Sequence, residues 1–209
     1  MRRSTAVTTT IVAVVLTACS AGHHPASPAV APTTTLPHTV SGTVDLRRLV
    51  VTTAPAGYEL LPSPPYGAVD LARLLAEFSD APSDDRVILQ DTRFKRGFTR
   101  GWQRVSPLGF FGVFVFEFAD GEGARSARDR FTDQNVSRKG AVAFTVGTID
   151  GAMGQSYVRT AVGEPPLRVH LVTFVRGPRL YQVGGQFADE SAPPDETVAF
   201  AETEAELAA

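Results

Sequence analysis

The stretch from Phe110 to Phe118 constrains the fold more than any other, because almost every residue in it is phenylalanine or valine. Side chains along a β-strand alternate between its two faces. One face here would carry Phe110, Gly112, Phe114, Phe116 and Phe118, and the other would carry Phe111, Val113 and Val115. A strand that is apolar on both faces has to be covered on both sides. We therefore expect Phe110–Phe118 to be the central strand of a sheet packed between layers.

Two hairpin-then-helix units are readable around this strand. Each has two extended segments joined by a turn and then a helical segment, with Asp120 as the cap of the first helix. The expected elements are Phe98–Val105, Phe110–Phe118 and 122–134 in the first unit, and Leu167–Val175, Leu180–Phe187 and Asp195–Leu207 in the second. Strands paired in this way and followed by helices predict an α+β fold, with an antiparallel or mixed β-sheet covered by helices.

Further elements are expected before the first unit. A strand is predicted within Val44–Thr52, and a short extended piece over Gly57–Leu61. A helix over Gly67–Phe78 has apolar residues at helical spacing, which predicts one buried stripe. A second helix is expected from a cap at Ser83 to a stop at Gly97, with Ile88, Leu89 and Phe94 buried.

The N-terminus has the layout of a secretory signal. Arg2 and Arg3 supply positive charge, and residues 11–16 form an apolar run. The run ends in Leu16-Thr17-Ala18-Cys19. This tetrad resembles the lipobox of bacterial lipoproteins, and the resemblance implies cleavage before Cys19 and attachment of lipid to its thiol. It also implies a location at the cell membrane, lipid-anchored on the extracytoplasmic face.

The chain then divides into three expected parts. Residues 1–18 are a lipoprotein signal peptide, and residues 19–42 are the lipidated cysteine and an Ala/Pro/Thr linker that is predicted to be a disordered tether. Residues 43–209 form a single α+β globular domain. Because Cys19 is the only cysteine, a disulfide framework and a cysteine-rich zinc site are excluded.

Composition and motifs narrow the function. The net charge of -2 suggests no nucleic-acid partner. We find no nucleophile elbow, phosphate loop or zinc-binding histidine pair, and we expect no metal, no cofactor and no enzymatic activity. His170 is the only histidine of the domain and is expected to be half-buried or at the surface. Catalysis by carboxylates stays open, although the acidic residues sit mostly where helices begin.

The polar segment of most interest is Arg100–Arg104. In a strand, Arg100, Trp102 and Arg104 would share one face. The arginines could then hold an anionic head group or stack on the indole. Alternatively, Trp102 is half-buried at the sheet margin, with the arginine stems packed beside it and their charged heads in water. We favour the second interpretation.

A looser resemblance covers most of the mature chain. Ala56-Gly57-Tyr58, the segment Gly97–Trp102, and Phe114–Gly123 running into a helix are similar to uncharacterised envelope lipoproteins of actinomycete-type bacteria. Some of these resemble the PsbP-like α+β sandwich. The resemblance implies helices over a mainly antiparallel sheet and assigns no site.

The sequence is compatible with three functions. The favoured hypothesis is a membrane-anchored extracytoplasmic lipoprotein with a non-enzymatic binding or accessory role in the cell envelope, its partner being an unknown envelope protein or lipid ligand. The alternative is a lipid or glycolipid carrier with an apolar pocket, suggested by the phenylalanines and by Gly112, Gly184 and Gly185, because glycines on strands make room for a ligand. An enzyme is the least favoured.

Overall fold

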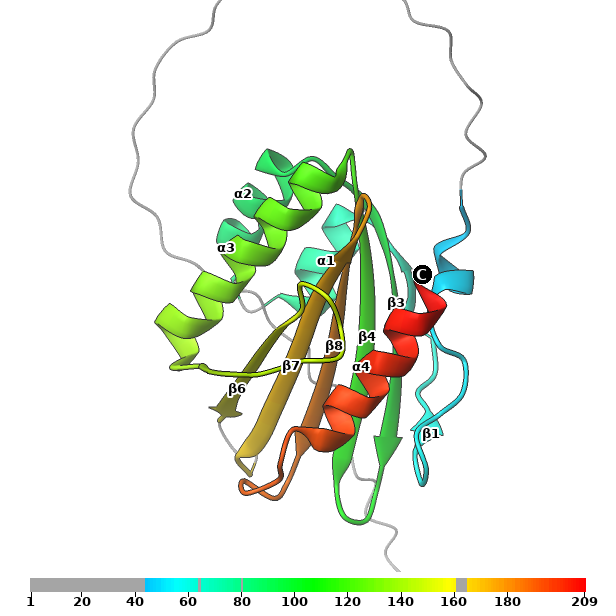
Figure 1. The fold of residues 1–209 in the computed structure, drawn as a ribbon, viewed down its shortest axis with the longest axis vertical. Helices are drawn as coiled ribbons and strands as arrows, with labels where there is room; N and C mark the ends of the chain where they lie inside the picture. The colour runs from blue at the N-terminus through cyan, green and yellow to red at the C-terminus, as the bar shows by residue number, and fades with distance from the viewer. Residues whose placement is uncertain (1–43, 64, 80, 161–164) are drawn as a thin grey trace, which may run out of the picture.

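The computed structural model describes residues 44–209, except residues 64, 80 and 161–164 and the side chain of Arg138. The expected signal peptide 1–18, the linker 19–42 and Cys19 therefore lie outside the described residues. The described part is α+β: an antiparallel sheet with helices on both faces (Figure 1). This confirms the predicted fold class.

The sheet is built from eight strands in the order β1-β3-β4-β8-β7-β6-β5, with β2 also paired to β3. All pairings are antiparallel. The strands are β1 (Glu59–Leu60), β2 (Gly67–Val69), β3 (Phe94–Arg104), β4 (Gly109–Phe118), β5 (Val142–Phe144), β6 (Met153–Arg159), β7 (Leu167–Arg176) and β8 (Arg179–Phe187).

Strand β4 lies between β3 and β8 and is covered on both sides, as its sequence predicts. Phe114, Phe116 and Phe118 belong to one hydrophobic core. Phe111, Val113 and Val115 belong to a second core on the other face. The alternating apolar pattern is thus the direct cause of a three-layer arrangement with the sheet in the middle.

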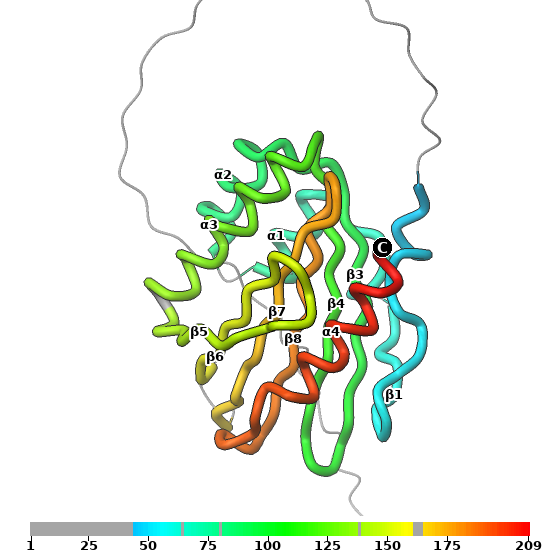
Figure 2. The backbone as a smooth tube through the Cα atoms, viewed as in Figure 1, coloured from blue at the N-terminus to red at the C-terminus, as the bar shows by residue number. Residues whose placement is uncertain are grey.

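The helices divide unequally between the two faces. The first core is closed by α1 (Leu71–Phe78), α2 (Pro82–Asp91) and α3 (Gly121–Lys139). The second is closed by α4 (Asp195–Leu207), which runs diagonally across the sheet and ends beside the segment that begins the described chain (Figures 1 and 2). Below, the two faces are called the three-helix face and the α4 face.

Helix α3 shows how local sequence sets an element. The Asp120 carboxylate accepts a hydrogen bond from the Gly123 amide (2.9 Å), as the predicted cap should. Gly140 ends the helix in the left-handed conformation, with φ of 60°. Ala124, Ala127 and Phe131 are buried against the sheet. The helix extends one turn further than the predicted 122–134 because no earlier glycine stops it.

Three of the predicted elements are wrong in kind or in extent. Val44–Thr52 contains no strand; Leu46–Leu49 is instead a short 3₁₀ helix, η1, which Asp45 caps by accepting from the Arg47 amide. The helix predicted over Gly67–Phe78 starts only at Leu71, because Gly67–Val69 pairs with β3 as β2.

The helix expected to run from Ser83 to Gly97 begins instead at Pro82, with Ala81 as an N-cap that makes no side-chain hydrogen bond, and ends at Asp91. The chain then turns at Arg93, whose φ is 59°, and enters β3 at Phe94. Basic residues that look like a helix end therefore belong to a strand, and cross-strand pairing with β4 decides the outcome.

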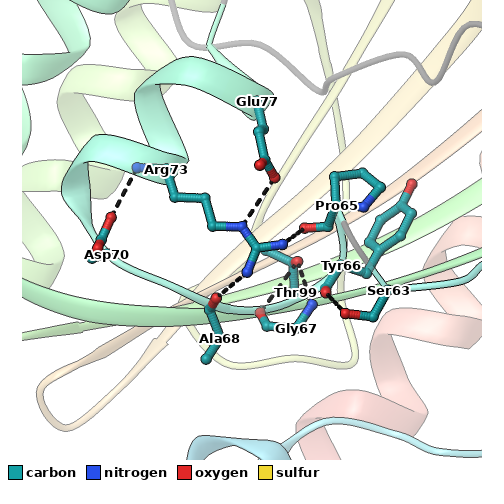
Figure 3. Close-up of polar contacts among 9 residues, drawn as sticks. All are labelled: Ser63, Pro65, Tyr66, Gly67, Ala68, Asp70, Arg73, Glu77 and Thr99. Carbon is teal, nitrogen blue, oxygen red and sulfur yellow. Dashed lines mark hydrogen bonds and ion pairs between the residues drawn. The ribbon is translucent and has the colours of Figure 1, made fainter.

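A set of contacts around Arg73 fixes the chain ahead of α1 (Figure 3). The Arg73 guanidinium donates to the carbonyl oxygens of Ala68 (2.7 Å) and Pro65 (2.8 Å) and to the Glu77 carboxylate (3.1 Å). The Asp70 carboxylate accepts from the Arg73 amide (2.8 Å) and caps the helix. These bonds hold residues 65–68 against the edge of α1, and with them the ring of Tyr66.

Candidate functional site

The stripe Arg100, Trp102 and Arg104 lies on the α4 face of β3. Phe98 and Trp102 belong to the core beneath α4, and the alternation along the strand places both arginines on the same side. The sequence therefore predicts correctly that these three side chains share one face of the sheet. The surroundings of the three side chains are more closed than expected.

Arg100 is occupied by the backbone of its own chain. Its Nη1 donates to the carbonyl oxygens of Val50 (2.9 Å) and Val51 (2.6 Å). Its guanidinium also lies 5.5 Å from the centre of the Phe98 ring. Burial lowers the pKa of the Arg100 guanidinium, and the nearby Glu204 carboxylate opposes that shift. The charged head holds the segment after η1 on the sheet rather than standing in water.

Trp102 is completely buried instead of half-buried. Its ring packs edge-to-face against Phe200 of α4, with 5.2 Å between centroids. The indole nitrogen Nε1 is buried and has no hydrogen-bond partner. Trp102 is thus a core residue that fixes α4 on the sheet, and the predicted half-buried place at the sheet margin is wrong because α4, which covers it, is distant in sequence.

Arg104 is the most exposed end of the stripe. Its guanidinium lies over the Tyr58 ring, 4.6 Å from the centroid, and its Nε donates to the Pro107 carbonyl oxygen (3.2 Å). Nη1 lies 3.9 Å from the Glu196 carboxylate at the start of α4. Arg104 therefore links the segment before β1 to the first turn of α4.

A groove opens beside this link. It has a volume of about 290 Å³ and is lined by Pro55, Ala56, Tyr58, Phe111, Glu196, Ala199, Phe200 and Thr203. The aromatic rings form an apolar wall, and the Glu196 carboxylate supplies one charge. Tyr58 and Phe111 pack edge-to-face at 4.9 Å. A groove of this size and lining suits a small apolar or weakly polar group.

A second groove of about 350 Å³ lies beyond the other end of the stripe. It is lined by Asp45, Leu46, Arg47, Ala68, Val69, Asp70, Arg96, Gly97 and Phe98. Two of its charged residues are engaged: Asp70 caps α1, and Arg96 bonds to Glu117 and to the Val44 carbonyl oxygen. The lining serves mainly to hold η1 against β2 and β3.

Glu204 is a residue that sequence reasoning missed. It lies on α4, is completely buried, and accepts a hydrogen bond from the Val51 amide (2.9 Å) through Oε2. Its Oε1 is buried without a partner. Burial raises the pKa of Glu204 from an ordinary 4.5 to about 7, against the lowering effects of the Val51 hydrogen bond and the Arg100 charge. A glutamate in an Ala/Glu-rich helix gives no sequence signal for such burial.

His170 is buried, contrary to the expectation of a half-buried or surface residue. Its Nε2 lies 2.8 Å from the Ala192 carbonyl oxygen, and its ring packs between Phe144 and Phe187. Burial lowers the pKa of the imidazole. His170 thus ties the loop before α4 to β7. Within the described residues, no three histidine or acidic side chains gather as a metal site.

Of the three glycines proposed to make room for a ligand, Gly185 has a different role. A Cβ on Gly185 would collide with Oγ1 of Thr197 on α4, so this glycine permits the close approach of the helix. Gly112 and Gly184 pair with one another between β4 and β8 and face the opposite side of the sheet.

Comparison with solved structures shows a distant likeness. The chain is similar to the extracellular domain of PknH from Mycobacterium tuberculosis, with a TM-score of 0.48, 9% sequence identity, and coverage of 77% of this chain and 94% of that chain. A likeness this distant carries no inference about activity, location or ligand. No protein-family model matches the chain, and no curated protein does.

Proposed function

We propose that this chain is a lipoprotein, anchored through lipid on Cys19 to the extracytoplasmic face of the cell membrane, with a non-enzymatic binding or accessory role in the cell envelope. The observation that carries the proposal is the tetrad Leu16-Thr17-Ala18-Cys19 behind a charged and apolar leader. Two or more acyl chains on one residue suffice for stable anchoring, whereas a single chain binds a membrane only marginally.

The described part of the chain offers a candidate surface for a partner. Among its helices, none combines the length and the apolar character that a bilayer crossing requires. What it offers a partner is the groove between Tyr58 and α4, where an apolar wall borders the Arg104–Glu196 pair. We expect an envelope partner to place an apolar group in this groove and a polar group against the pair.

The anchor is tested by replacing Cys19 with serine and fractionating cells. We expect the wild-type chain in the membrane fraction and the Cys19→Ser variant outside it, because serine has no thiol to carry the lipid. A second, matched variant, Ser20→Ala, should stay with the membrane. Sedimentation of the Cys19→Ser variant with membranes would overturn the proposed anchor.

The binding role is tested by crosslinking in the native envelope. We expect a partner to be recovered with the wild-type chain and lost on Ala199→Trp, which fills the groove from an exposed position on α4. Recovery of the protein alone, in all growth conditions, would contradict a binding role.

The alternative function is a lipid or glycolipid carrier. The aromatic wall of the groove favours it, but a volume of about 290 Å³ lies at the lower end for small-ligand sites. Mass spectrometry of the natively purified protein distinguishes the two. A bound acyl ligand would support the carrier, whereas a protein that carries only its own anchor would remove it.

A further inference from the structure

A row of glycines crosses the middle of the three-helix face. Gly101 of β3 pairs with Gly112 of β4, and Gly112 pairs with Gly184 of β8. The three residues are in register, so this band of the sheet has no side chains for three neighbouring strands. It is called the glycine row below. Such a band lets another group approach the backbone closely.

The two ends of the row differ. Tyr66 covers Gly101 so closely that a Cβ there would collide with its ring, and the Arg73 contacts hold Tyr66 in this place (Figure 3). Gly112 is less crowded: a Cβ there would meet the Phe114 ring at 3.4 Å and a backbone oxygen at 4.0 Å. The aromatic ring at Gly101 therefore forms one wall beside Gly112, where an added Cβ would make only ordinary contacts.

Buried amide side chains border the row along β8. Gln182 and Gln186 flank Gly184 at i−2 and i+2, and the alternation of the strand directs both to the three-helix face. Gln182 is 2% exposed and Gln186 is 4% exposed. Nε2 of Gln182 and Oε1 of Gln186 are buried and have no hydrogen-bond partner.

Unpartnered amides of this kind are costly and need an explanation. A buried donor or acceptor without a partner costs about 1–3 kcal/mol, and natural proteins contain few. Leucine would fill either position without that cost. Two glutamines on either side of a side-chain-free band therefore point to a polar group that binds there.

The charge of this face defines the group. The register aligns Thr99, Phe114, Gln182 and Thr173 on one side of the glycine row, and Gln103, Phe110, Gln186 and Val169 on the other. These residues are all uncharged, and burial raises the pKa of Tyr66 to about 12, so its phenol stays neutral. An ion directly over the glycine row would find no opposite charge among these residues; further along the second line, Lys139 Nζ lies 3.3 Å from the hydroxyl of Tyr157, which pairs with Val169.

We propose that the glycine row is the floor of a binding site for a neutral carbohydrate unit, held by Gln182 and Gln186 and bordered by the rings of Tyr66 and Phe114. A hydroxyl group donates and accepts, and so it satisfies both free amide atoms. A sugar ring also has an apolar face that packs on an aromatic ring. This site is on the opposite side of the sheet from the groove beside α4, and it goes beyond the proposed function.

The test measures the melting temperature of the full chain with increasing N-acetylglucosamine, and with glucose in parallel. A ligand that binds only the folded state raises the melting temperature with concentration. We expect this rise for the wild type with at least one of the two sugars. Gln182→Leu and Gly112→Ala should weaken the apparent affinity by about tenfold or more.

Two comparisons between variants distinguish a ligand site from a purely structural role of these residues. Gly147→Ala is the matched control, because a Cβ at Gly147 meets nothing within 4 Å, and it should bind like the wild type. Gln182→Leu without sugar should keep or raise the melting temperature, since it removes an unpartnered donor. The proposal is overturned if neither sugar stabilises the wild type, if Gln182→Leu binds equally well, or if Gln182→Leu melts earlier without sugar.

Discussion

The two faces of the sheet bury polar groups of different kinds. The α4 face holds ionisable side chains: Arg100 and Glu204 meet around Val51, and Arg96, Glu117 and Arg179 form a chain of ion pairs further along, with N–O distances of 2.6 and 3.8 Å. On the three-helix face, the residues that border the glycine row are uncharged, and the free groups are amides. The region around Arg100 and Glu204 should therefore respond to pH, and the glycine row should respond to neutral ligands.

The difference follows from what covers each face. Helix α4 is the single helix over its face, and the segment around Val50 and Val51 completes the cover, with backbone groups that charged side chains can bind. Three helices with apolar stripes cover the other face. On the α4 face the buried charges hold a non-helical segment of backbone, whereas on the three-helix face the fully buried Asp85 joins α2 to α3 by accepting a hydrogen bond from the Gln134 side-chain amide (2.9 Å).

The largest loss of stability is expected from Trp102→Ala, which removes the ring that packs against Phe200 of α4. Loss of a fully buried aromatic side chain leaves a cavity against Phe200 and should lower the free energy of unfolding by about 3–5 kcal/mol. Urea unfolding followed by far-UV circular dichroism measures it. Val105→Ala, at a residue 80% exposed, is the control and should change little. A loss below about 1 kcal/mol would contradict the packing of α4 on Trp102.

The next largest effect is expected on the pH dependence of the free energy of unfolding, through Glu204. Because the pKa is raised from 4.5 to about 7, the folded state binds more protons than the unfolded state between these values. Protonated Glu204 therefore stabilises the folded state fully below pH 4.5, and this stabilisation is lost as the pH rises through 7. The free energy of unfolding should fall by about 3 kcal/mol over this range because of this group. Glu204→Gln should remove most of this slope and unfold at higher urea than the wild type at pH 8. An unchanged pH profile in Glu204→Gln would show that another group sets it.

Gly101→Ala tests the three-helix face. The new methyl group displaces the Tyr66 ring and should cost about 1–3 kcal/mol, as overpacking does. Gly147→Ala, where the methyl group has free space, should stay within about 0.5 kcal/mol. Combining Gly101→Ala with Tyr66→Ala should recover part of the loss, and failure to recover it would mean that Tyr66 does not cover the glycine row.

The smallest effect is expected at the Arg104–Glu196 pair. The two charges lie 3.9 Å apart and the Glu196 side chain is 56% exposed. Such pairs contribute about 0–1 kcal/mol, so Glu196→Gln should barely move the urea midpoint. The same variant should still reduce crosslinking to a partner at the groove. If the midpoint fell as far as it does for Trp102→Ala, the pair would be structural rather than part of a binding surface.

Much of the fold was predictable from periodicity. The alternation of Phe110–Phe118 identifies β4, and the hairpin of β7 and β8 and the terminal helix α4 have nearly their predicted bounds. Errors fall where local signals and strand pairing disagree. Lys95 and Arg96 look like a helix end, yet both belong to β3, where Arg96 pairs with Glu117 of β4. Gly67–Val69 looks helical in sequence but pairs with β3.

The sites were harder to predict because their parts meet only in the folded chain. Alternation places Arg100, Trp102 and Arg104 on one face, but the partners of Arg100 lie about fifty residues earlier in the sequence. Glu204 lies 153 residues from Val51 and sits in a helix whose composition suggests solvent. Gly112 and Gly184 were singled out as glycines on strands, but only the register shows that they adjoin.

The proposed function depends most on lipid attached to Cys19, and the intact mass of the protein extracted from membranes tests this attachment directly. We expect the mature chain to begin at Cys19 and to weigh more than its polypeptide by the mass of a diacylglyceryl group, with or without a further acyl chain. A chain that begins elsewhere, or whose mass equals that of the bare polypeptide, would contradict the account.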